Sequence, residues 1–141
     1  MKPFVLIALG VALVGGAVIA AVLLLRADAP DLTGADWMIE DIAGRGVVDG
    51  SPATLQFLAG GQLAGNVSCN RLIGTYDVAG GNAITLSPSG TTMMACPPAL
   101  MEQEQRLLAL LPLITRYEVD AKTGALLLSA PGGAAILARR P

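Results

Sequence analysis

The sequence predicts a mainly β domain, or α+β by a strict count, preceded by an N-terminal transmembrane helix. In the domain, an antiparallel, barrel-like meander sheet packs against one helix. Three observations lead to this fold class. Short runs of β-favouring residues alternate with glycine-rich turns, one amphipathic segment interrupts them, and an uncharged apolar run precedes them all. We therefore divide the chain into an anchor (1–26), a linker (27–35) and a domain (36–141).

The anchor is predicted from the apolar run, which extends from Pro3 to Leu25 without a charged residue. At about 1.5 Å per residue, a helix of this length reaches roughly 34 Å, enough to cross a hydrocarbon core of about 30 Å. A signal peptide is the alternative, but its hydrophobic region usually has only about 7–15 residues. We expect residues 3–25 to lie in the membrane as an anchor or an uncleaved signal.

The flanking charges predict the orientation of this segment. Lys2 and the α-amino group precede it, whereas Arg26 on the other side is offset by Asp28 and Asp31. The positive-inside bias then places the N-terminus in the cytoplasm and the domain outside. The chain has nine basic residues, of which Lys2 and Arg26 belong to the anchor. The part after the anchor therefore contains seven basic and eleven acidic residues. No basic patch with interleaved aromatic residues occurs, so we expect no nucleic-acid partner.

Eight short runs of β-favouring residues follow the linker. They are 36–42, 53–59, 62–68, 72–78, 83–87, 114–120, 125–130 and 134–140. Most are separated by glycine-containing turns such as Gly60-Gly61 and Gly80-Gly81, and paired glycines tolerate the positive φ that tight hairpins require. This spacing predicts an antiparallel meander that is closed or nearly closed. Alternation along the second run places Leu55 and Phe57 inside the sheet.

Residues 97–112 interrupt the strands and predict a helix of about four turns. Prolines near its start suit a first turn that needs no internal N–H partner, and Pro112 ends it. Leu100, Leu107 and Leu111 form an apolar stripe that Met101, Leu108 and Leu110 broaden. We expect this helix to pack its stripe on the sheet.

The residue types present argue against an enzyme. The chain has no histidine, which excludes Ser-His-Asp and Cys-His catalysis and histidine-ligated zinc. The acidic residues do not form a pair placed across a substrate, so we expect solvated surface charges. The candidates for such a pair are two clusters, Asp36, Glu40 and Asp41 on the first run and Glu102 and Glu104 on the predicted helix. We accordingly expect no catalytic residue, no cofactor and no bound metal.

Cys69 and Cys96 are the only cysteines, and three interpretations remain open for them. An even count in an exported domain favours a structural disulfide. Cys96 lies just before the predicted helix, where the dipole lowers a thiol pKa, so a redox pair is the second interpretation. The third is a Cu(I) site in which Met93 and Met94 join the two sulfurs. This third interpretation is weakened because a methionine near a cysteine more often fills the hydrophobic core.

Two segments, "SCNRLIGTYDVAGGNAITL" (68–86) and "TMMACPPALMEQEQRLLALL" (92–111), resemble the META domain, the family of the bacterial heat-shock protein HslJ. The positions that match the family pattern are Trp37, Cys69, Asn70, Gly74, Tyr76, Thr92, Met94, Cys96, Pro97, Glu102 and Glu104. The resemblance extends from about Asp36 to Arg140. Three residues depart from it: Ser68 replaces a glycine, Leu72 a common aromatic residue, and Met93 a common basic residue.

The resemblance implies a compact barrel-like domain with one helix in the bacterial cell envelope. It implies no established reaction, although some members are linked to heat shock and antibiotic tolerance. Together with the anchor, it predicts a single-pass protein of the bacterial inner membrane whose C-terminal domain lies in the periplasm or another extracytoplasmic space. We expect a non-catalytic domain that contacts an envelope protein or a small ligand. A thiol-redox protein and a carrier of a small apolar molecule are the alternatives.

Arg71 is the last residue with a predicted role. Its charge is complementary to Glu102 and Glu104 on the predicted helix, and it lies two residues after Cys69. We therefore expect Arg71 to form an ion pair with one of these carboxylates and so join the sheet to the helix.

Overall fold

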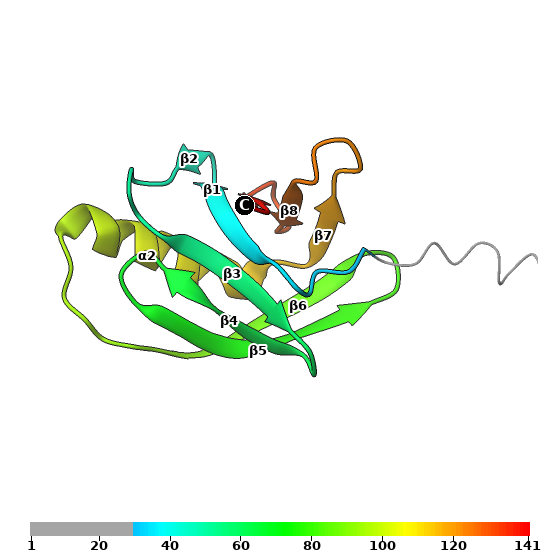
Figure 1. Ribbon diagram of the computed structural model, residues 1–141, viewed down its shortest axis with the longest axis horizontal. Helices are drawn as coiled ribbons and strands as arrows, with labels where there is room; N and C mark the ends of the chain where they lie inside the picture. Colours follow the sequence, from blue (N-terminus) through cyan, green and yellow to red (C-terminus); the bar gives the residue numbers. More distant parts are fainter. Residues whose placement is uncertain (1–29) are drawn as a thin grey trace, which may run out of the picture.

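The computed structural model describes residues 30–141, which fold into an antiparallel β-barrel with one packed helix (Figure 1). Strands β1 and β3 to β9 form the wall, and the two-residue strand β2 lies beside β1. The elements are β1 (Asp36–Ile42), β2 (Arg45–Gly46), β3 (Ala53–Leu58), β4 (Gln62–Val67), β5 (Arg71–Ala79), β6 (Ala83–Thr91), α2 (Pro98–Leu110), the 3-10 helix η1 (Leu111–Leu113), β7 (Arg116–Val119), β8 (Leu126–Ser129) and β9 (Ala135–Arg139).

The sheet closes on itself. Neighbouring strands pair antiparallel in the order β2-β1-β3-β4-β5-β6-β7-β8-β9, and β1 also pairs with β9. The pairing of β6 with β7 is the shortest in the wall, with Ala83 opposite Arg116. Closure removes the free strand edges that an open meander would expose. The predicted barrel-like sheet is therefore confirmed.

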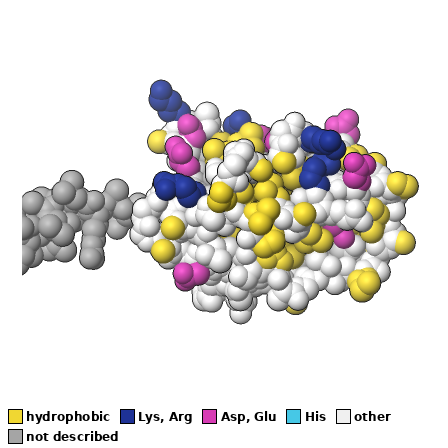
Figure 2. Space-filling model, turned by 180° about the vertical axis from the view of Figure 1, so that it is seen from behind, with side chains coloured by type: hydrophobic (Ala, Val, Ile, Leu, Met, Phe, Trp, Pro, Cys, Tyr) yellow, Lys and Arg dark blue, Asp and Glu magenta, His cyan; other side chains and the backbone are white. Residues whose placement is uncertain are grey.

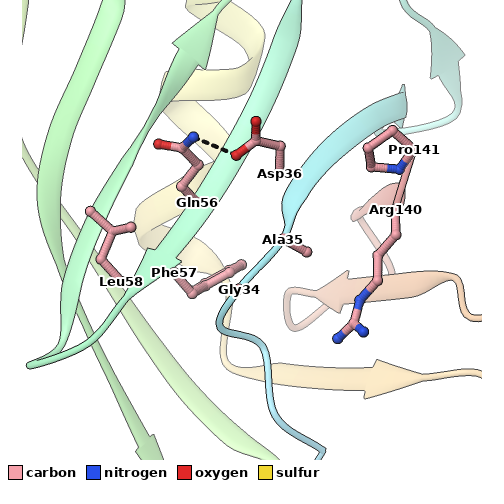
Figure 3. Close-up of a pocket in the computed structure, with 8 residues that line it drawn as sticks. All are labelled: Gly34, Ala35, Asp36, Gln56, Phe57, Leu58, Arg140 and Pro141. Carbon is pink, nitrogen blue, oxygen red and sulfur yellow. Dashed lines mark hydrogen bonds between the residues drawn. The ribbon is translucent and has the colours of Figure 1, made fainter.

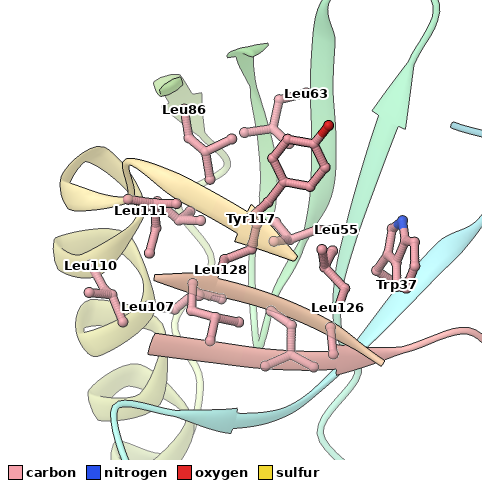
Figure 4. Packing of buried hydrophobic residues seen from close by; sticks show 14 of the residues in the cluster. Trp37, Leu55, Leu63, Leu86, Leu107, Leu110, Leu111, Tyr117, Leu126 and Leu128 are labelled. Carbon is pink, nitrogen blue, oxygen red and sulfur yellow. The ribbon is translucent and has the colours of Figure 1, made fainter. Parts of the chain in front are cut away.

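The interior of the barrel is filled with side chains. Leu55 and Phe57 of β3 are buried as the alternation predicts, and the single tryptophan, Trp37 of β1, is fully buried beside them. Figure 4 shows leucines of α2 and η1 pointing from the helix toward Leu55, Leu126 and Leu128 of the strands. One contiguous hydrophobic cluster therefore joins the helix to the wall of the barrel.

Helix α2 is confirmed, but its buried face is more polar than predicted. Leu107, Leu110 and Leu111 are buried, whereas Leu100 is only partly so. In the half of the helix nearer its N-terminus, the buried positions are held by Gln103, which is 1% exposed, and Glu104, which is 5% exposed. The expectation that Glu104 is a solvated surface charge is therefore wrong.

The domain also begins earlier than predicted. Leu32, assigned to the linker, is buried in the core, and its carbonyl oxygen accepts a 2.9 Å hydrogen bond from Nε1 of Trp37. Thr33 forms a bridge to Phe57 of β3. These contacts hold residues 32–33 against the barrel, at the end opposite α2 (Figure 1).

The predicted transmembrane helix, residues 3–25, lies outside the described residues. Between residues 30 and 141, no helix combines the length and the apolar character that a membrane crossing requires.

Gly74 permits a close contact between two neighbouring strands of the barrel. It lies in β5 at a shift of the β5–β6 register, and a Cβ built on it would lie 2.5 Å from the Ser87 carbonyl oxygen and 3.0 Å from Cα of Pro88. Both are backbone atoms, so the strands would have to separate. Gly90 of β6, in the same pair of strands, would instead meet only the Ile73 side chain, at 3.8 Å.

We expect Gly74→Ala to lower the free energy of unfolding by about 2 kcal/mol or more, because steric strain in a packed region costs about 1–3 kcal/mol. Gly90→Ala is the matched control and should change stability by no more than about 0.5 kcal/mol. Urea unfolding of the full chain in detergent micelles, followed by Trp37 fluorescence, measures both. Equal losses in the two variants would contradict the backbone-contact argument.

Candidate functional site

Cys69 and Cys96 form a disulfide, with 6.1 Å between their Cα atoms. Cys69 is buried in the turn between β4 and β5, and Cys96 lies in the loop that leads into α2. The bond therefore ties a strand turn to the start of the helix. The predicted disulfide between Cys69 and Cys96 is therefore present.

Asn70, the next residue, fixes the loop before α2 with its side chain. It is 2% exposed, and its Oδ1 accepts hydrogen bonds from the Thr92 hydroxyl at 2.9 Å and from the Met94 backbone N–H at 2.7 Å. Its Nδ2 donates to Oε1 of Glu104 at 2.9 Å. One buried amide thus joins the turn, the loop and the helix.

Glu104 completes this cluster from α2. Its Oε2 accepts hydrogen bonds from the backbone N–H groups of Asn70, at 2.9 Å, and Cys69, at 3.3 Å, while Oε1 accepts from the Asn70 amide. A buried carboxylate needs this number of donors, because an isolated charge in a protein interior is costly. We call Cys69, Asn70, Thr92, Cys96 and Glu104 the motif cluster.

A second polar cluster lies beside the first and was missed in the sequence. Gln103 donates from Nε2 to the hydroxyls of Ser51, at 2.8 Å, and Ser68, at 2.9 Å. Its Oε1 accepts from the Val48 N–H at 2.6 Å. The two hydroxyls bond each other at 2.9 Å, so this cluster ties α2 to the loop between β2 and β3.

A signal for both clusters was present in the sequence. Positions 103 and 104 each lie three or four residues from both Leu100 and Leu107. This spacing places them on the apolar stripe of the helix. Polar residues on such a stripe must find buried partners. The pattern identifies the helix side chains, but it does not identify their partners.

The predicted ion pair of Arg71 is not formed. The Arg71 side chain is exposed, and the oxygens of Glu104 accept their hydrogen bonds from Asn70 and Cys69. Glu102 instead lies 3.7 Å from Arg45, with both side chains largely exposed. The prediction was wrong because charge complementarity carries no information on direction, and Glu104 faces the interior.

The remaining motif residues support the barrel itself. Tyr76 donates its hydroxyl to the Leu58 carbonyl at 3.1 Å and contacts Phe57 edge to face, with ring centroids 5.0 Å apart. The Arg140 guanidinium lies 4.7 Å from the Trp37 ring. Pro97 precedes the first residue of α2, and its carbonyl accepts the N–H groups of Leu100 and Met101.

A separate pocket of about 510 Å³ lies at the end of the barrel opposite α2 (Figure 3). Asp36 and Gln56 hydrogen-bond each other across the strands that line it, and Arg140 donates to the Asp31 carbonyl at 3.0 Å. Its charged side chains therefore already have partners within the chain. We assign no chemistry to this pocket.

The motif cluster holds three segments of the chain together. Its polar side chains form hydrogen bonds with one another. Because both cysteines are in the disulfide, neither can supply a thiolate to the Cu(I) site that the sequence suggested. Among residues 30–141, no group of three histidine, cysteine or carboxylate side chains is placed to hold a metal ion.

Comparison with known proteins agrees with this architecture. A protein from Burkholderia xenovorans solved by NMR is 25% identical, with a TM-score of 0.65, over 82% of this chain and 94% of that chain. A second NMR structure, 22% identical with a TM-score of 0.56 over 76% and 90% of the two chains, shares the fold. No curated protein matches the chain. Residues 30–140 match the META domain, which is most of the sequence. The chain therefore belongs to the META domain family.

Proposed function

We propose that the chain is a membrane-tethered, non-catalytic META-domain protein of the bacterial cell envelope that acts through contacts with a protein or a small ligand. One observation carries the proposal: the polar and sulfur groups of the motif cluster bond one another. Groups used in this way stabilise the fold and are not free to bind or activate a substrate. Any link to stress or antibiotic tolerance would then depend on binding.

The location rests on two further observations. The apolar run from Pro3 to Leu25 has the length of a membrane-spanning helix. The Cys69–Cys96 disulfide is typical of domains in an oxidising compartment such as the periplasm. Both support a single-pass protein of the inner membrane with an extracytoplasmic domain.

A contact role is supported by the distribution of apolar side chains. The hydrophobic cluster fills the barrel, which disfavours an apolar molecule enclosed in the sheet. Several large apolar side chains are exposed, among them Ile73 at 64% and Leu113 at 59%. Figure 2 shows apolar side chains gathered over the middle of one face. Exposed apolar surface of this kind is typical of binding sites.

The thiol-redox alternative is disfavoured by the surroundings of both sulfurs. Cys69 is only 8% exposed, and thiol–disulfide exchange requires access to a sulfur. Pro97 and Pro98 follow Cys96 and have no N–H, so the start of α2 offers fewer donors to a thiolate. The structural interpretation explains both features without a reaction.

The test uses the full chain in bacterial membranes. Membranes are washed at alkaline pH and alkylated without reductant, and the intact mass is measured. In parallel, protease is added to spheroplasts. We expect the protein to stay with the membranes, to carry no alkyl group, and to be cleaved outside the cytoplasm. Two alkylated cysteines, or protection from the protease, would overturn the proposed location.

A further inference from the structure

Three of the five methionines line one surface pocket beside the disulfide. The pocket has a volume of about 390 Å³; Met93 and Met94 come from the loop before α2, and Met101 comes from the first turn of that helix. The expectation that methionine near Cys96 fills the core is wrong. The Met93 residue is 96% exposed and Met94 is 56% exposed.

The backbone that carries these side chains is fixed. The Asn70 side chain accepts a hydrogen bond from the Met94 N–H at 2.7 Å and donates one to the Met94 carbonyl at 3.4 Å. The Thr92 hydroxyl donates to the same Asn70 side chain. The disulfide holds the loop two residues later, at Cys96. The thioethers are thus presented from a held loop and a helix, and the flexible methionine side chain lets their sulfurs turn toward a common point.

The lining of the pocket favours a cation. Its one charged side chain is that of Glu104, whose oxygens stay bonded to Asn70 and Cys69, and it contains no lysine or arginine. A hard cation such as Mg²⁺ prefers oxygen ligands, whereas thioethers select a soft cation such as Cu(I). Because the chain has no histidine and both cysteines are bonded, methionine is its remaining soft ligand type.

We propose that Met93, Met94 and Met101 bind a soft monovalent cation, Cu(I) or its analogue Ag(I), through their three thioether sulfurs. Met101 takes the place of the cysteine sulfurs that the sequence had suggested for such a site. The inference goes beyond the proposed function, because it assigns a metal ion as ligand. Its test does not depend on where the chain is located, so either proposal can fail without the other.

The test is a titration of the full chain with silver nitrate, with the disulfide intact and the methionine methyl groups labelled with ¹³C. Ag(I) in chloride-free buffer needs no reductant, which would open the disulfide and create competing thiolates. We expect the three methyl resonances to shift together and to saturate at one equivalent of silver. Met38, which is 49% exposed on β1, should not shift and serves as the internal control.

Leucine variants identify the ligands, because leucine matches the volume of methionine and lacks the sulfur. We expect Met93→Leu, Met94→Leu and Met101→Leu each to weaken Ag(I) binding about tenfold or more, since even an outer-sphere partner of a metal site is worth about tenfold. Met38→Leu should bind like the parent chain. Urea unfolding checks that each variant is folded. A simultaneous shift of Met38, a response of only one methionine, or unchanged binding by the three variants would overturn the proposal.

Discussion

Glu104→Ala is expected to destabilise the domain more than any other single exchange of a charged residue. It removes the common acceptor of three N–H donors, two from the backbone of Cys69 and Asn70 and one from the Asn70 side chain. Each buried donor left without a partner costs about 1–3 kcal/mol. We expect the free energy of unfolding to fall by about 3 kcal/mol or more, measured by urea unfolding of the full, oxidised chain in detergent.

Glu102→Ala is the matched control, since it removes the same side chain from the same helix two residues earlier. The side chain of Glu102 is 71% exposed, and its ion-pair partner Arg45 is 67% exposed. Exposed pairs contribute only about 0–1 kcal/mol, so this variant should stay close to the parent chain. Similar losses for the two variants would show that the buried hydrogen bonds of Glu104 do not hold the helix.

Glu104→Gln separates charge from shape. Glutamine keeps one oxygen as an acceptor but replaces the other with an NH₂ group, which is a donor. The N–H that bonds the replaced oxygen would then lose its acceptor. We expect an effect between those of Glu104→Ala and Glu102→Ala. This ordering follows from the three N–H donors that face Glu104, and it would be lost if Glu104 acted only through its volume.

The strands were predictable because their signals are local. The run at 36–42 coincides with β1, and the run at 53–59 contains β3. Gly60 and Gly61 have the positive φ expected of the turn that follows β3. Alternation and turn chemistry act over a few residues, so one sequence suffices to read them. Closure was harder to predict, because β1 pairs with β9 across almost the whole domain.

The partners of Gln103 and Glu104 in the two polar clusters could not be predicted, because they too lie far away in the sequence. The partners of Glu104 lie 34 and 35 residues away, and Val48 lies 55 residues from Gln103. Composition rules assign Glu to the surface, and only the tertiary contacts override that assignment. Residues 32 and 33 show the same limit, since the Leu32 carbonyl bonds Trp37 and Thr33 forms its bridge to Phe57 of β3.

Loss of the disulfide is the second large effect that we expect. Cys69 and Cys96 are separated by 27 residues, and cross-linking a loop of this size contributes roughly 3.5 kcal/mol in the chain-entropy model. Cys69→Ala with Cys96→Ala removes the bond without leaving a reactive thiol. We expect the free energy of unfolding to fall by about 3 kcal/mol, again measured by urea unfolding of the full chain.

The disulfide and the Asn70 side chain join the same turn to the same loop, so their contributions should not be additive. Asn70 bonds Thr92 and Met94, and the disulfide bonds Cys96 of the same loop. Each link alone keeps this loop close to the turn that contains Cys69 and Asn70. When both are removed, the loop is freed from this turn. We therefore expect Asn70→Ala to cost more without the disulfide than with it, by about 0.5 kcal/mol or more, as found for residues that share partners. A double-mutant cycle measures this coupling. Strict additivity would show that the two links stabilise the domain independently, and the motif cluster would then not act as one unit.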